Sequence, residues 1–276
     1  MPELPEVETI KNDLRPRLIG RSFTDATFFW ERMVRQPSPD ELTRRLRGQR
    51  IEDIARRGKY LIFRLSGGEA LVLHLRMSGS LLLTGNGGVS AEFERYTRAV
   101  FTLDNGMKLR FIDRRKLGTV SLVEDESVIA DKLGPEPLDP GFTAEVLAGQ
   151  LSKHKAPLKA VLCDQAVIAG IGNMYADESL FHARLHPLRK ANSLTSEEIV
   201  RLHRAIHQVL ERAIGNGGAS VSDYFRPGGE LGSSQSTFAV AHRGGQPCPV
   251  CHTPIVRIPL RNRGTYFCPR CQATYS

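Results

Sequence analysis

The stretch from Cys248 to Cys271 reads CPVCHTPIVRIPLRNRGTYFCPRC, and it decides the fold of the last part of the chain. Its two Cys-x2-Cys pairs, Cys248/Cys251 and Cys268/Cys271, are separated by sixteen residues. This spacing is typical of a zinc ribbon, in which four thiolates surround one structural Zn²⁺ and leave no open position for catalysis. Disulfides are disfavoured because the sequence begins without an export signal. We therefore expect one structural zinc ion and no organic cofactor.

The region around this ribbon carries most of the excess positive charge. The whole chain of 276 residues has 38 Lys and Arg against 30 Asp and Glu, a formal net charge of +8. From residue 226 onward there are six arginines and one acidic residue, Glu230. The arginines are Arg226, Arg243, Arg257, Arg261, Arg263 and Arg270. A planar guanidinium suits phosphate, so this region favours a nucleic-acid partner, although a solvated basic face or a protein-binding ribbon gives the same pattern.

Length and composition exclude several classes of protein. With 41% hydrophobic and 25% charged residues the chain is expected to fold, and its length favours two domains. No apolar run approaches the ~20 residues that a membrane-spanning helix needs. The first six residues, MPELPE, are acidic where a signal peptide is basic and then apolar. We expect a cytoplasmic protein with no membrane partner.

The first half of the chain predicts one helix followed by many strands. Pro5 suits the first turn of a helix that would carry Val7, Ile10, Leu14 and Leu18 on one face. Strand-like runs follow at residues 23–30, 50–54, 60–65, 70–75, 99–103, 108–112 and 119–123. Glycine-rich turn signals separate several of them, at residues 66–68, 86–88 and 104–106. The pattern predicts a β-sandwich domain over residues 1–133.

Helical patterns replace the strands after a proline-punctuated linker at residues 133–137. The clearest helix runs from Thr195 to Ala213, with Thr195 and Glu198 as a capping box and Gly215 as its C-terminal stop. A helical domain is expected over residues 138–227. Small and polar residues at 228–245 predict a flexible connection to a zinc ribbon at 240–276. The predicted fold class is α+β: a β-sandwich, a helical domain and a β-hairpin ribbon.

The opening Pro2-Glu3-Leu4-Pro5-Glu6-Val7-Glu8-Thr9 resembles the signature of the formamidopyrimidine-DNA glycosylase family, bacterial base-excision enzymes for oxidised purines. Further family-like motifs follow in the same order and cover essentially the whole chain. They are Arg57-Gly58-Lys59-Tyr60-Leu61, His74 to Gly79, Gly170 to Glu178, Gly217-Gly218 to Asp223-Tyr224, and the ribbon. The resemblance implies a catalytic β-sandwich, a helix-two-turn-helix DNA-binding domain and a zinc ribbon. It also implies both glycosylase and abasic-site lyase activity.

The chemistry that the N-terminus can perform follows from its residue types. Removal of Met1 makes Pro2 a secondary amine that can add to C1′ of a deoxyribose and expel the base. The resulting iminium ion has no N–H proton to lose, so it persists as an electron sink for β- and δ-elimination. The resemblance implies this Schiff-base role for Pro2 and a proton-donor role for Glu3. It also makes Lys59 a proton donor and phosphate partner, and Arg263 the arginine that clamps phosphates around the lesion.

The resemblance further implies residues that hold and open the duplex. Asn173 stands at a glycine turn that leads into a helix and matches a phosphate ligand, and Lys155 and Lys159 match positions near phosphate and the extruded base. Base extrusion needs a wedge, and Met77 and Arg115 match two of the family's three wedge residues. The third position holds Leu117 where the family has phenylalanine. Tyr96 stands where many relatives carry a DNA-contacting histidine.

Several interpretations stay open. Residues 217–224 match the loop that folds over a flipped purine, but a mobile linker has the same composition. Cys163 is expected to be a buried small hydrophobe. The rival functions are an endonuclease VIII-type glycosylase for oxidised pyrimidines and a damaged-DNA-binding protein without catalysis. The expected partner is duplex DNA with oxidised bases or abasic sites, bound by a monomer that associates with the bacterial nucleoid.

Overall fold

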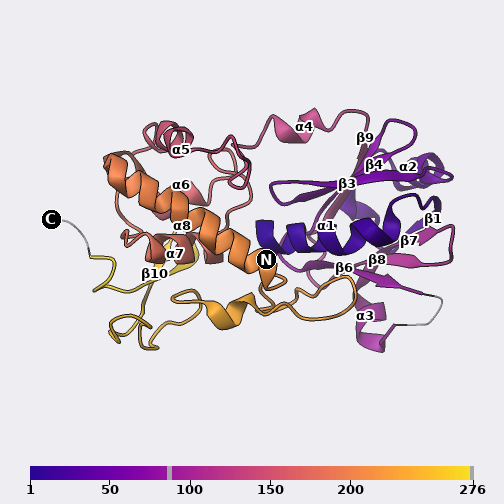
Figure 1. Ribbon diagram of the computed structural model, residues 1–276. Helices are drawn as coiled ribbons and strands as arrows, with labels where there is room; N and C mark the ends of the chain where they lie inside the picture. Colours follow the sequence, from indigo (N-terminus) through magenta and orange to yellow (C-terminus); the bar gives the residue numbers. More distant parts are fainter. Residues whose placement is uncertain (86–88, 274–276) are drawn as a thin grey trace. The chain divides into compact units, whose positions relative to one another are not determined.

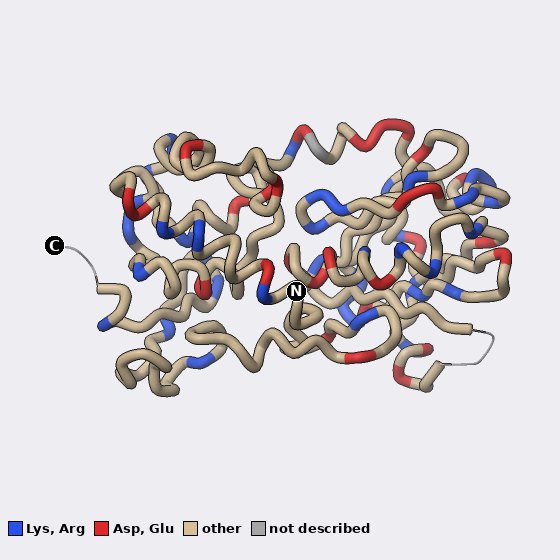
Figure 2. Tube along the Cα trace, in the orientation of Figure 1, with Lys and Arg blue, Asp and Glu red and all other residues tan. Residues whose placement is uncertain are grey.

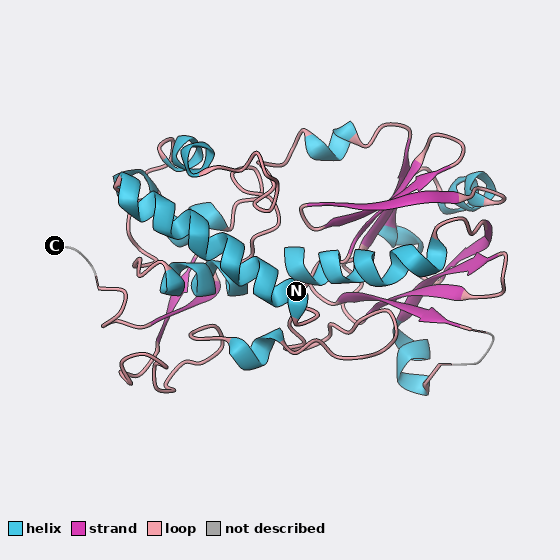
Figure 3. Cartoon of the chain, in the orientation of Figure 1, coloured by secondary structure: helices cyan, strands magenta, loops and turns pink. Residues whose placement is uncertain are grey.

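The computed structural model describes residues 1–85 and 89–273, so the predicted turn at 86–88 and the end of the predicted ribbon lie outside the described residues. The chain divides into two compact units (Figure 1). Unit 1 comprises Met1–Ala130 and Asn216–Gln235, and unit 2 comprises Asp131–Gly215 and Ser236–Ser276. Strands dominate the first unit and helices the second (Figure 3), which confirms the predicted α+β fold.

Unit 1 begins with helix α1, Leu4–Leu18. Glu3 is its N-cap, and a reciprocal capping box joins Glu3 and Glu6, so the helix starts one residue before the predicted Pro5. Pro16 lies inside the helix without ending it. The predicted apolar face, Val7, Ile10, Leu14 and Leu18, is buried, because it packs into the core of unit 1.

Two sheets, in which most neighbouring strands are antiparallel, form the body of unit 1. The four-stranded sheet has the order β1-β7-β8-β6 and the five-stranded sheet the order β2-β9-β5-β4-β3. The strands are β1 Phe23–Phe28, β2 Val34–Gln36, β3 Ile51–Arg57, β4 Tyr60–Leu65, β5 Ala70–His74, β6 Gly79–Thr84, β7 Thr97–Leu103, β8 Lys108–Asp113 and β9 Thr119–Val123. The seven predicted strands are present: β4 and β9 have the predicted ends, and the other five differ by up to three residues at an end. Strands β2 and β6 were not predicted. Strand β6 was not predicted because its first residue, Gly79, is also the last residue of the His74 to Gly79 motif.

One apolar core lies between the two sheets of unit 1. It includes Leu61 and Phe63 of β4 and Phe101 and Phe111 of the four-stranded sheet, together with the apolar face of α1. Alternate residues of each strand therefore face the same core, as expected for a sandwich. The short helices of this unit are η1 Glu31–Met33, α2 Pro39–Leu46, α3 Ala91–Tyr96 and α4 Ser127–Ala130.

Unit 2 is built from helices and ends in a hairpin. Its helices are α5 Ala144–Leu151, α6 Leu158–Leu162, α7 Asn173–His182, η2 Ala191–Ser193 and α8 Ser196–Gly215, and η3 Ser234–Thr237 precedes the hairpin. The predicted capping box is present before α8: the Glu198 carboxylate accepts from the Thr195 N–H, and the Thr195 hydroxyl from the Glu198 N–H. The helix continues through Gly215, and the left-handed backbone follows at Gly217, where φ is 71°.

The segment before the hairpin is more ordered than its composition suggests. The carboxylate of Glu178 accepts hydrogen bonds from three consecutive backbone N–H groups, those of Ala239, Val240 and Ala241, at 2.8–2.9 Å. Glu178 is 3% exposed. The prediction of a flexible connection across 228–245 was therefore wrong for this part, because a buried carboxylate from α7 holds it.

The hairpin pairs β10, Val256–Leu260, with β11, Arg263–Phe267, through a two-residue turn at Arg261 and Asn262. Both turn residues have positive φ, 47° and 61°, which is the backbone that tight hairpins require. Arg261 and Arg263 are exposed at this tip. Among the described residues, no helix is both long and apolar enough to cross a bilayer.

Candidate DNA-repair site and zinc centre

The N-terminal residues are held by the first turn of α1. Pro2 directly precedes the N-cap Glu3, whose side chain is 1% exposed and accepts from the backbone N–H of Glu6. The Glu6 carboxylate in turn accepts from the Glu3 N–H at 2.7 Å. The backbone at Glu3 is thus locked, and the positive end of the helix lies next to Pro2.

Glu6 also connects the N-terminus to the loop at 217–224. Its second oxygen accepts from the Ala219 N–H at 2.8 Å. A Cβ on Gly218 would lie 2.9 Å from the Glu6 side chain, and the φ of Gly218 is 78°, so this position requires glycine. Burial, reinforced by the charge of Glu6, raises the pKa of Tyr224, whose hydroxyl donates to the Gly217 carbonyl at 3.0 Å. The loop is thus anchored to the helix that carries Pro2.

Lys59 lies in the turn between β3 and β4, after Gly58 with a φ of 55°. It is 6% exposed. The neighbouring strand end is tied to α1 by Arg56, whose Nε donates to Glu8 at 2.8 Å. Burial opposes ionisation of Glu8, yet hydrogen bonds and charges of Lys11 and Arg56 outweigh it and lower the pKa of Glu8. Glu8 therefore serves as an anchor between α1 and β3.

His74, at the end of β5, is held neutral. Burial, with the charges of Arg76 and Lys59, lowers its pKa to about 3. Its Nδ1 accepts from the Arg76 N–H at 2.9 Å, and its ring packs edge-on against Tyr60 with centroids 4.5 Å apart. A neutral His74 ring adds no positive charge beside Lys59.

The three predicted wedge residues are exposed on two neighbouring turns of unit 1. Met77 is 43% exposed in the turn after β5, and Leu117 is 40% exposed in the loop after β8. Arg115 is exposed in the same loop. The backbones of the two turns meet because the Arg115 N–H donates to the Ser78 hydroxyl at 3.2 Å. The structure therefore links the two turns that carry these three side chains.

Tyr96 is half-buried at the end of α3 and is surrounded by guanidinium groups. Arg114 lies 4.9 Å from its ring centroid, and Arg95 and Arg98 lie 5.5 and 5.9 Å away. Arg114 also pairs with Asp223 of the 217–224 loop at 3.5 Å. Tyr96 thus supports the arginine that links the loop after β8 to the 217–224 loop.

Unit 2 gathers Asn173, Lys159 and the strand that begins with Arg263. The Asn173 side-chain amide donates to the Gly264 carbonyl at 3.0 Å, and its own Oδ1 is buried without a hydrogen-bond partner among the described residues. Lys159 is 2% exposed and donates to the Gly264 carbonyl and the Thr265 hydroxyl at 3.0 and 2.9 Å. Lys155, in contrast, is exposed in the loop before α6.

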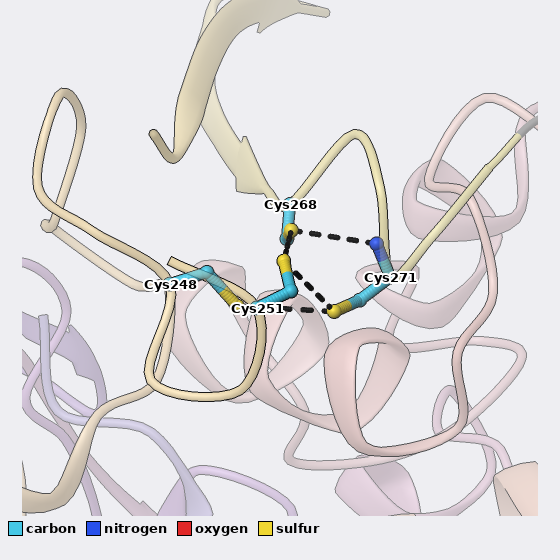
Figure 4. Close-up of side chains that lie close together, drawn as sticks. All are labelled: Cys248, Cys251, Cys268 and Cys271. Atoms are coloured by element: carbon cyan, nitrogen blue, oxygen red, sulfur yellow. Dashed lines mark hydrogen bonds between the residues drawn. The ribbon is translucent and has the colours of Figure 1, made fainter. Parts of the chain in front are cut away.

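The four cysteines of the ribbon converge on one point (Figure 4). Their sulfur atoms all lie within 4.8 Å of one another, with individual separations of 3.4, 3.5 and 3.8 Å. A tetrahedron of thiolates with Zn–S distances of about 2.3 Å has sulfurs roughly 3.8 Å apart, so the donor set fits zinc. Backbone N–H groups of Val250 and Cys271 donate to Cys248 and Cys268 sulfurs. The cluster is a structural zinc site.

Basic residues are spread along both units rather than confined to the ribbon (Figure 2). Two of the six C-terminal arginines hold other parts of the chain. Arg226 pairs with Asp13 at 2.7 Å, and Arg243 donates to the carbonyls of Phe238, Ala239 and Pro247. The remaining arginines of the predicted basic region lie in the hairpin, at Arg257, Arg261 and Arg263, and between the last two cysteines, at Arg270.

A cavity of about 380 Å³ in unit 2 lies beside the hairpin tip. Its lining includes Arg261, Arg263, Lys159 and Cys163. Cys163 is only half-buried, so the prediction of a fully buried residue was wrong. The cause is its position at the C-terminal end of the short helix α6, where the chain turns to line the cavity.

The sequence did not reveal three buried carboxylates that bind the backbone of segments carrying predicted site residues. Asp113, Asp177 and Glu178 are at most 3% exposed, and each accepts backbone N–H groups of a functional segment. Asp177 and Glu178 stood inside the Gly170 to Glu178 motif, and Asp113 stood just before Arg115. Asp113 borders the basic run Arg114-Arg115-Lys116, whereas the Gly170 to Glu178 motif has no Lys or Arg, so no shared sequence signal marked these three carboxylates.

A β-sandwich with a proline beside the capped start of its first helix, a glycine turn into a helix, and a four-thiolate hairpin are together typical of zinc-ribbon DNA glycosylases. Sequence profiles agree over three ranges: the formamidopyrimidine-DNA glycosylase N-terminal domain matches residues 1–120, the H2TH domain residues 133–224, and the zinc finger found in FPG and IleRS residues 245–274. The chain belongs to the formamidopyrimidine-DNA glycosylase family.

Relatives from several bacteria are similar over the full length. The formamidopyrimidine-DNA glycosylases of Symbiobacterium thermophilum and Chloroflexus aurantiacus are 46% and 47% identical over 99% of this chain, covering 89% and 98% of their own lengths. Among solved structures, Lactococcus lactis FPG (MutM) in complex with Fapy-dG-containing DNA superposes with a TM-score of 0.90 at 34% identity over 99% and 100% of the two chains. MutM (FPG) from Thermus thermophilus gives 0.88 at 40% identity over 100% of both chains.

Proposed function

We propose that this chain removes oxidised purines from duplex DNA and cleaves the strand, with Pro2 as the nucleophile. It is a DNA glycosylase with abasic-site lyase activity, as its family membership and its similarity to a relative bound to Fapy-dG DNA support. The observation that carries the mechanism is the locked N-terminus. Glu3 is buried and caps α1 directly beside Pro2, so removal of Met1 would place an acid next to the new amine at the positive end of α1.

The reaction begins when the neutral Pro2 amine adds to C1′ and the damaged base leaves with the electron pair of the glycosidic bond. Glu3 supplies the proton that opens the sugar ring at its oxygen. The product is an iminium ion between Pro2 and C1′. Loss of a C2′ proton converts the iminium ion to an enamine. The enamine electrons then expel the 3′ phosphate, which leaves with the electron pair of the C3′–O bond, and a conjugated iminium ion forms. A second elimination breaks the C5′–O bond, and water finally releases the sugar remnant and frees Pro2.

Two features keep the amine reactive. An ammonium group next to the positive end of α1 is disfavoured, which favours the neutral amine that attacks. Lys59, nearly buried on the β3–β4 turn, is proposed to add a second positive charge and to donate protons and bind phosphate during β-elimination. Arg263, exposed at the hairpin tip, is proposed to clamp the phosphates around the lesion and assist δ-elimination.

The remaining predicted residues are proposed to bind DNA. Lys155 and Asn173 would contact phosphates. The space that the extruded nucleotide leaves would be filled by Met77, Arg115 and Leu117. Tyr96 would lie against the DNA backbone. Lys159 is proposed to act near the phosphate through the hairpin strand that it holds, since its ammonium already donates to Gly264 and Thr265.

The predicted boundaries 1–133, 138–227 and 240–276 are kept as a functional division into catalytic, helix-two-turn-helix and zinc-ribbon domains. We also propose that the protein acts as a monomer, in the cytoplasm and on the nucleoid, because its substrate is chromosomal duplex DNA.

A comparison of substrates separates this proposal from its rivals. Single-turnover excision of 8-oxoguanine opposite cytosine is expected to be much faster than excision of thymine glycol from the same duplex. The reverse order would assign the chain to the endonuclease VIII type. Tight binding to both duplexes without cleavage of either would identify a damage-binding protein.

The phosphate role of Arg263 has its own test. Arg263→Ala is expected to weaken duplex binding and to lower the slope of log K against log salt by about 1, because one phosphate contact is lost. Arg44→Ala, whose guanidinium pairs with Glu41 on helix α2, is the matched control and should leave the slope unchanged. An unchanged slope in Arg263→Ala, with tight binding retained, would remove Arg263 from the phosphate contacts.

A further inference from the structure

Asp113, the last residue of β8, is 1% exposed and faces the backbone of the loop that follows it. One carboxylate oxygen accepts from the N–H groups of Leu117 and Gly118, both at 2.7 Å. The other accepts from the Arg115 N–H at 3.1 Å and from the Ser78 hydroxyl. A single buried carboxylate therefore binds four donors from two separate turns.

The loop after β8 needs this support because its backbone is unfavourable. Lys116 has a φ of 58°, which a residue with a side chain adopts at a cost. A Cβ on Gly118 would lie 2.5 Å from the Phe111 ring, so the loop also closes tightly onto the sheet. On its outer side the Lys116 ammonium lies 4.3 Å from the Trp30 ring centroid. These contacts fix the loop backbone while the Arg115 and Leu117 side chains remain exposed.

The second turn, which carries Met77, is tied to the same carboxylate. Ser78 is 2% exposed, and its hydroxyl donates to Asp113 while accepting from the Arg115 N–H. The turn is closed by a hydrogen bond from the Gly79 N–H to the Leu75 carbonyl at 2.9 Å. A Cβ on Gly79 would lie 2.4 Å from that carbonyl oxygen, so no larger residue fits. The position of Met77 is thus linked to that of Arg115 and Leu117.

We propose that Asp113 is a positioning residue that makes Met77, Arg115 and Leu117 one preorganised wedge for base extrusion. This inference rests on the proposed glycosylase function. A carboxylate suits the task because both oxygens accept hydrogen bonds, whereas an amide at this position offers one accepting oxygen and turns an N–H₂ group toward the other donors. A wedge that is already ordered loses little conformational entropy when it enters the duplex.

The test uses Asp113→Asn and compares a substrate that needs the wedge with one that does not. In duplex DNA with 8-oxoguanine opposite cytosine, the base must be extruded; in single-stranded DNA with an abasic site, nothing has to be extruded or replaced. Single-turnover excision from the duplex is expected to fall at least about tenfold, because hydrogen bonds to a buried charge are lost. Fluorescence of 2-aminopurine beside the lesion should report a matching loss in extrusion rate. Borohydride trapping on the single strand should stay within about twofold of wild type, since the chemical step is untouched.

Two further variants protect the test against a folding defect. Ser78→Ala removes one donor and leaves the carboxylate in place, so it should lower duplex excision by about threefold with the single-strand reaction intact. Asp125→Asn is the matched control: Asp125 accepts from the N–H and hydroxyl of Ser127 at an exposed turn, and its loss should change the reaction rate on neither substrate.

In a Leu117→Ala background, Asp113→Asn should lower the rate of duplex excision clearly less than in wild type, because the wedge is already impaired.

Equal losses on both substrates, or full additivity with Leu117→Ala, would overturn the positioning role. These outcomes differ from failure of the proposed function itself. If wild-type protein lacking Met1 traps neither substrate, the glycosylase proposal fails; if it traps both and Asp113→Asn affects them equally, only the positioning role fails.

Discussion

The ammonium nitrogen of Lys159 lies 2.7 Å from Oδ1 of Asp177, and the two side chains are 2% and 1% exposed. Burial raises the pKa of Asp177 to about 7, against the opposing charge of Lys159. The second Asp177 oxygen accepts from the Tyr266 N–H at 3.1 Å, while Lys159 donates to Gly264 and Thr265. Side chains of helices α6 and α7 thus bind the three residues that follow Arg263. These bonds fix the position of the Arg263 backbone within unit 2.

Removal of one partner of this pair is expected to destabilise unit 2. Lys159→Met leaves the Asp177 carboxyl buried without its cation and should lower the free energy of unfolding by about 3 kcal/mol. Urea unfolding followed by far-UV circular dichroism measures the change. Lys155→Met, an exposed lysine four residues earlier, is the control and should stay within about 0.5 kcal/mol of wild type. Equal stabilities of the two variants would contradict a supporting role for the pair.

His74 predicts acid destabilisation of unit 1. Its pKa in the folded state is about 3, whereas the unfolded chain has the ordinary value of 6.5. Between these values the unfolded chain binds a proton that the folded protein does not, so stability falls as the pH is lowered, by up to about 1.4 kcal/mol per pH unit. His74→Gln should remove this part of the slope, and His154→Gln should retain it. Parallel stability–pH curves for His74→Gln and wild type would refute the assignment.

Zinc removal is expected to loosen the hairpin and weaken DNA binding. Chelation should release one zinc ion per chain, and affinity for duplex DNA should fall because Arg263 loses its rigid support. Cys251→Ser should bind zinc poorly from the outset. Cys163→Ser, which changes the cysteine outside the cluster, should keep both metal and affinity. Metal analysis with fluorescence anisotropy on labelled duplex measures both quantities, and unchanged affinity of the chelated protein would contradict the supporting role of zinc.

Leu117 predicts a gain by substitution. An aromatic ring stacks on the neighbouring bases better than leucine does, so Leu117→Phe should increase the rate of base extrusion by roughly threefold. The loop accepts the change because the Leu117 side chain is 40% exposed and its backbone N–H is bound by Asp113. Stopped-flow fluorescence with 2-aminopurine beside 8-oxoguanine measures the rate. A slower extrusion rate in Leu117→Phe would contradict this prediction and show that leucine fits between the bases better than phenylalanine.

Motifs with fixed spacing predicted most of the fold and the candidate site. The Cys-x2-Cys pairs, the capping box at the start of α8 and the period-two strands each depend on local geometry, which neighbouring residues specify. Strand β2 was missed because three residues, Val34–Gln36, are too short to show a period. The helix boundary at Gly215 was misplaced because glycine is permitted inside a helix, and only the positive φ of Gly217 ends it.

Long-range support was beyond sequence reasoning. Glu178 and residues 239–241 are about sixty positions apart in the chain, and Asp113 and Ser78 are thirty-five apart. No local pattern connects such residues, and an acidic side chain in a basic motif does not reveal whether it faces DNA or backbone. Lys159 illustrates the same difficulty, since a lysine in a basic segment is nearly fully buried once α7 and β11 supply its partners.

The proposed nucleophile is the Pro2 amine, which attacks C1′ of the damaged nucleotide. The most direct measurement is borohydride trapping of protein lacking Met1 on a duplex with 8-oxoguanine opposite cytosine, followed by mass spectrometry of the protease-digested complex. We expect one covalent complex, with the reduced sugar attached to the peptide that begins at Pro2. A protein whose Met1 is demonstrably removed and which gives no covalent complex, or gives one attached at Lys59, would contradict it.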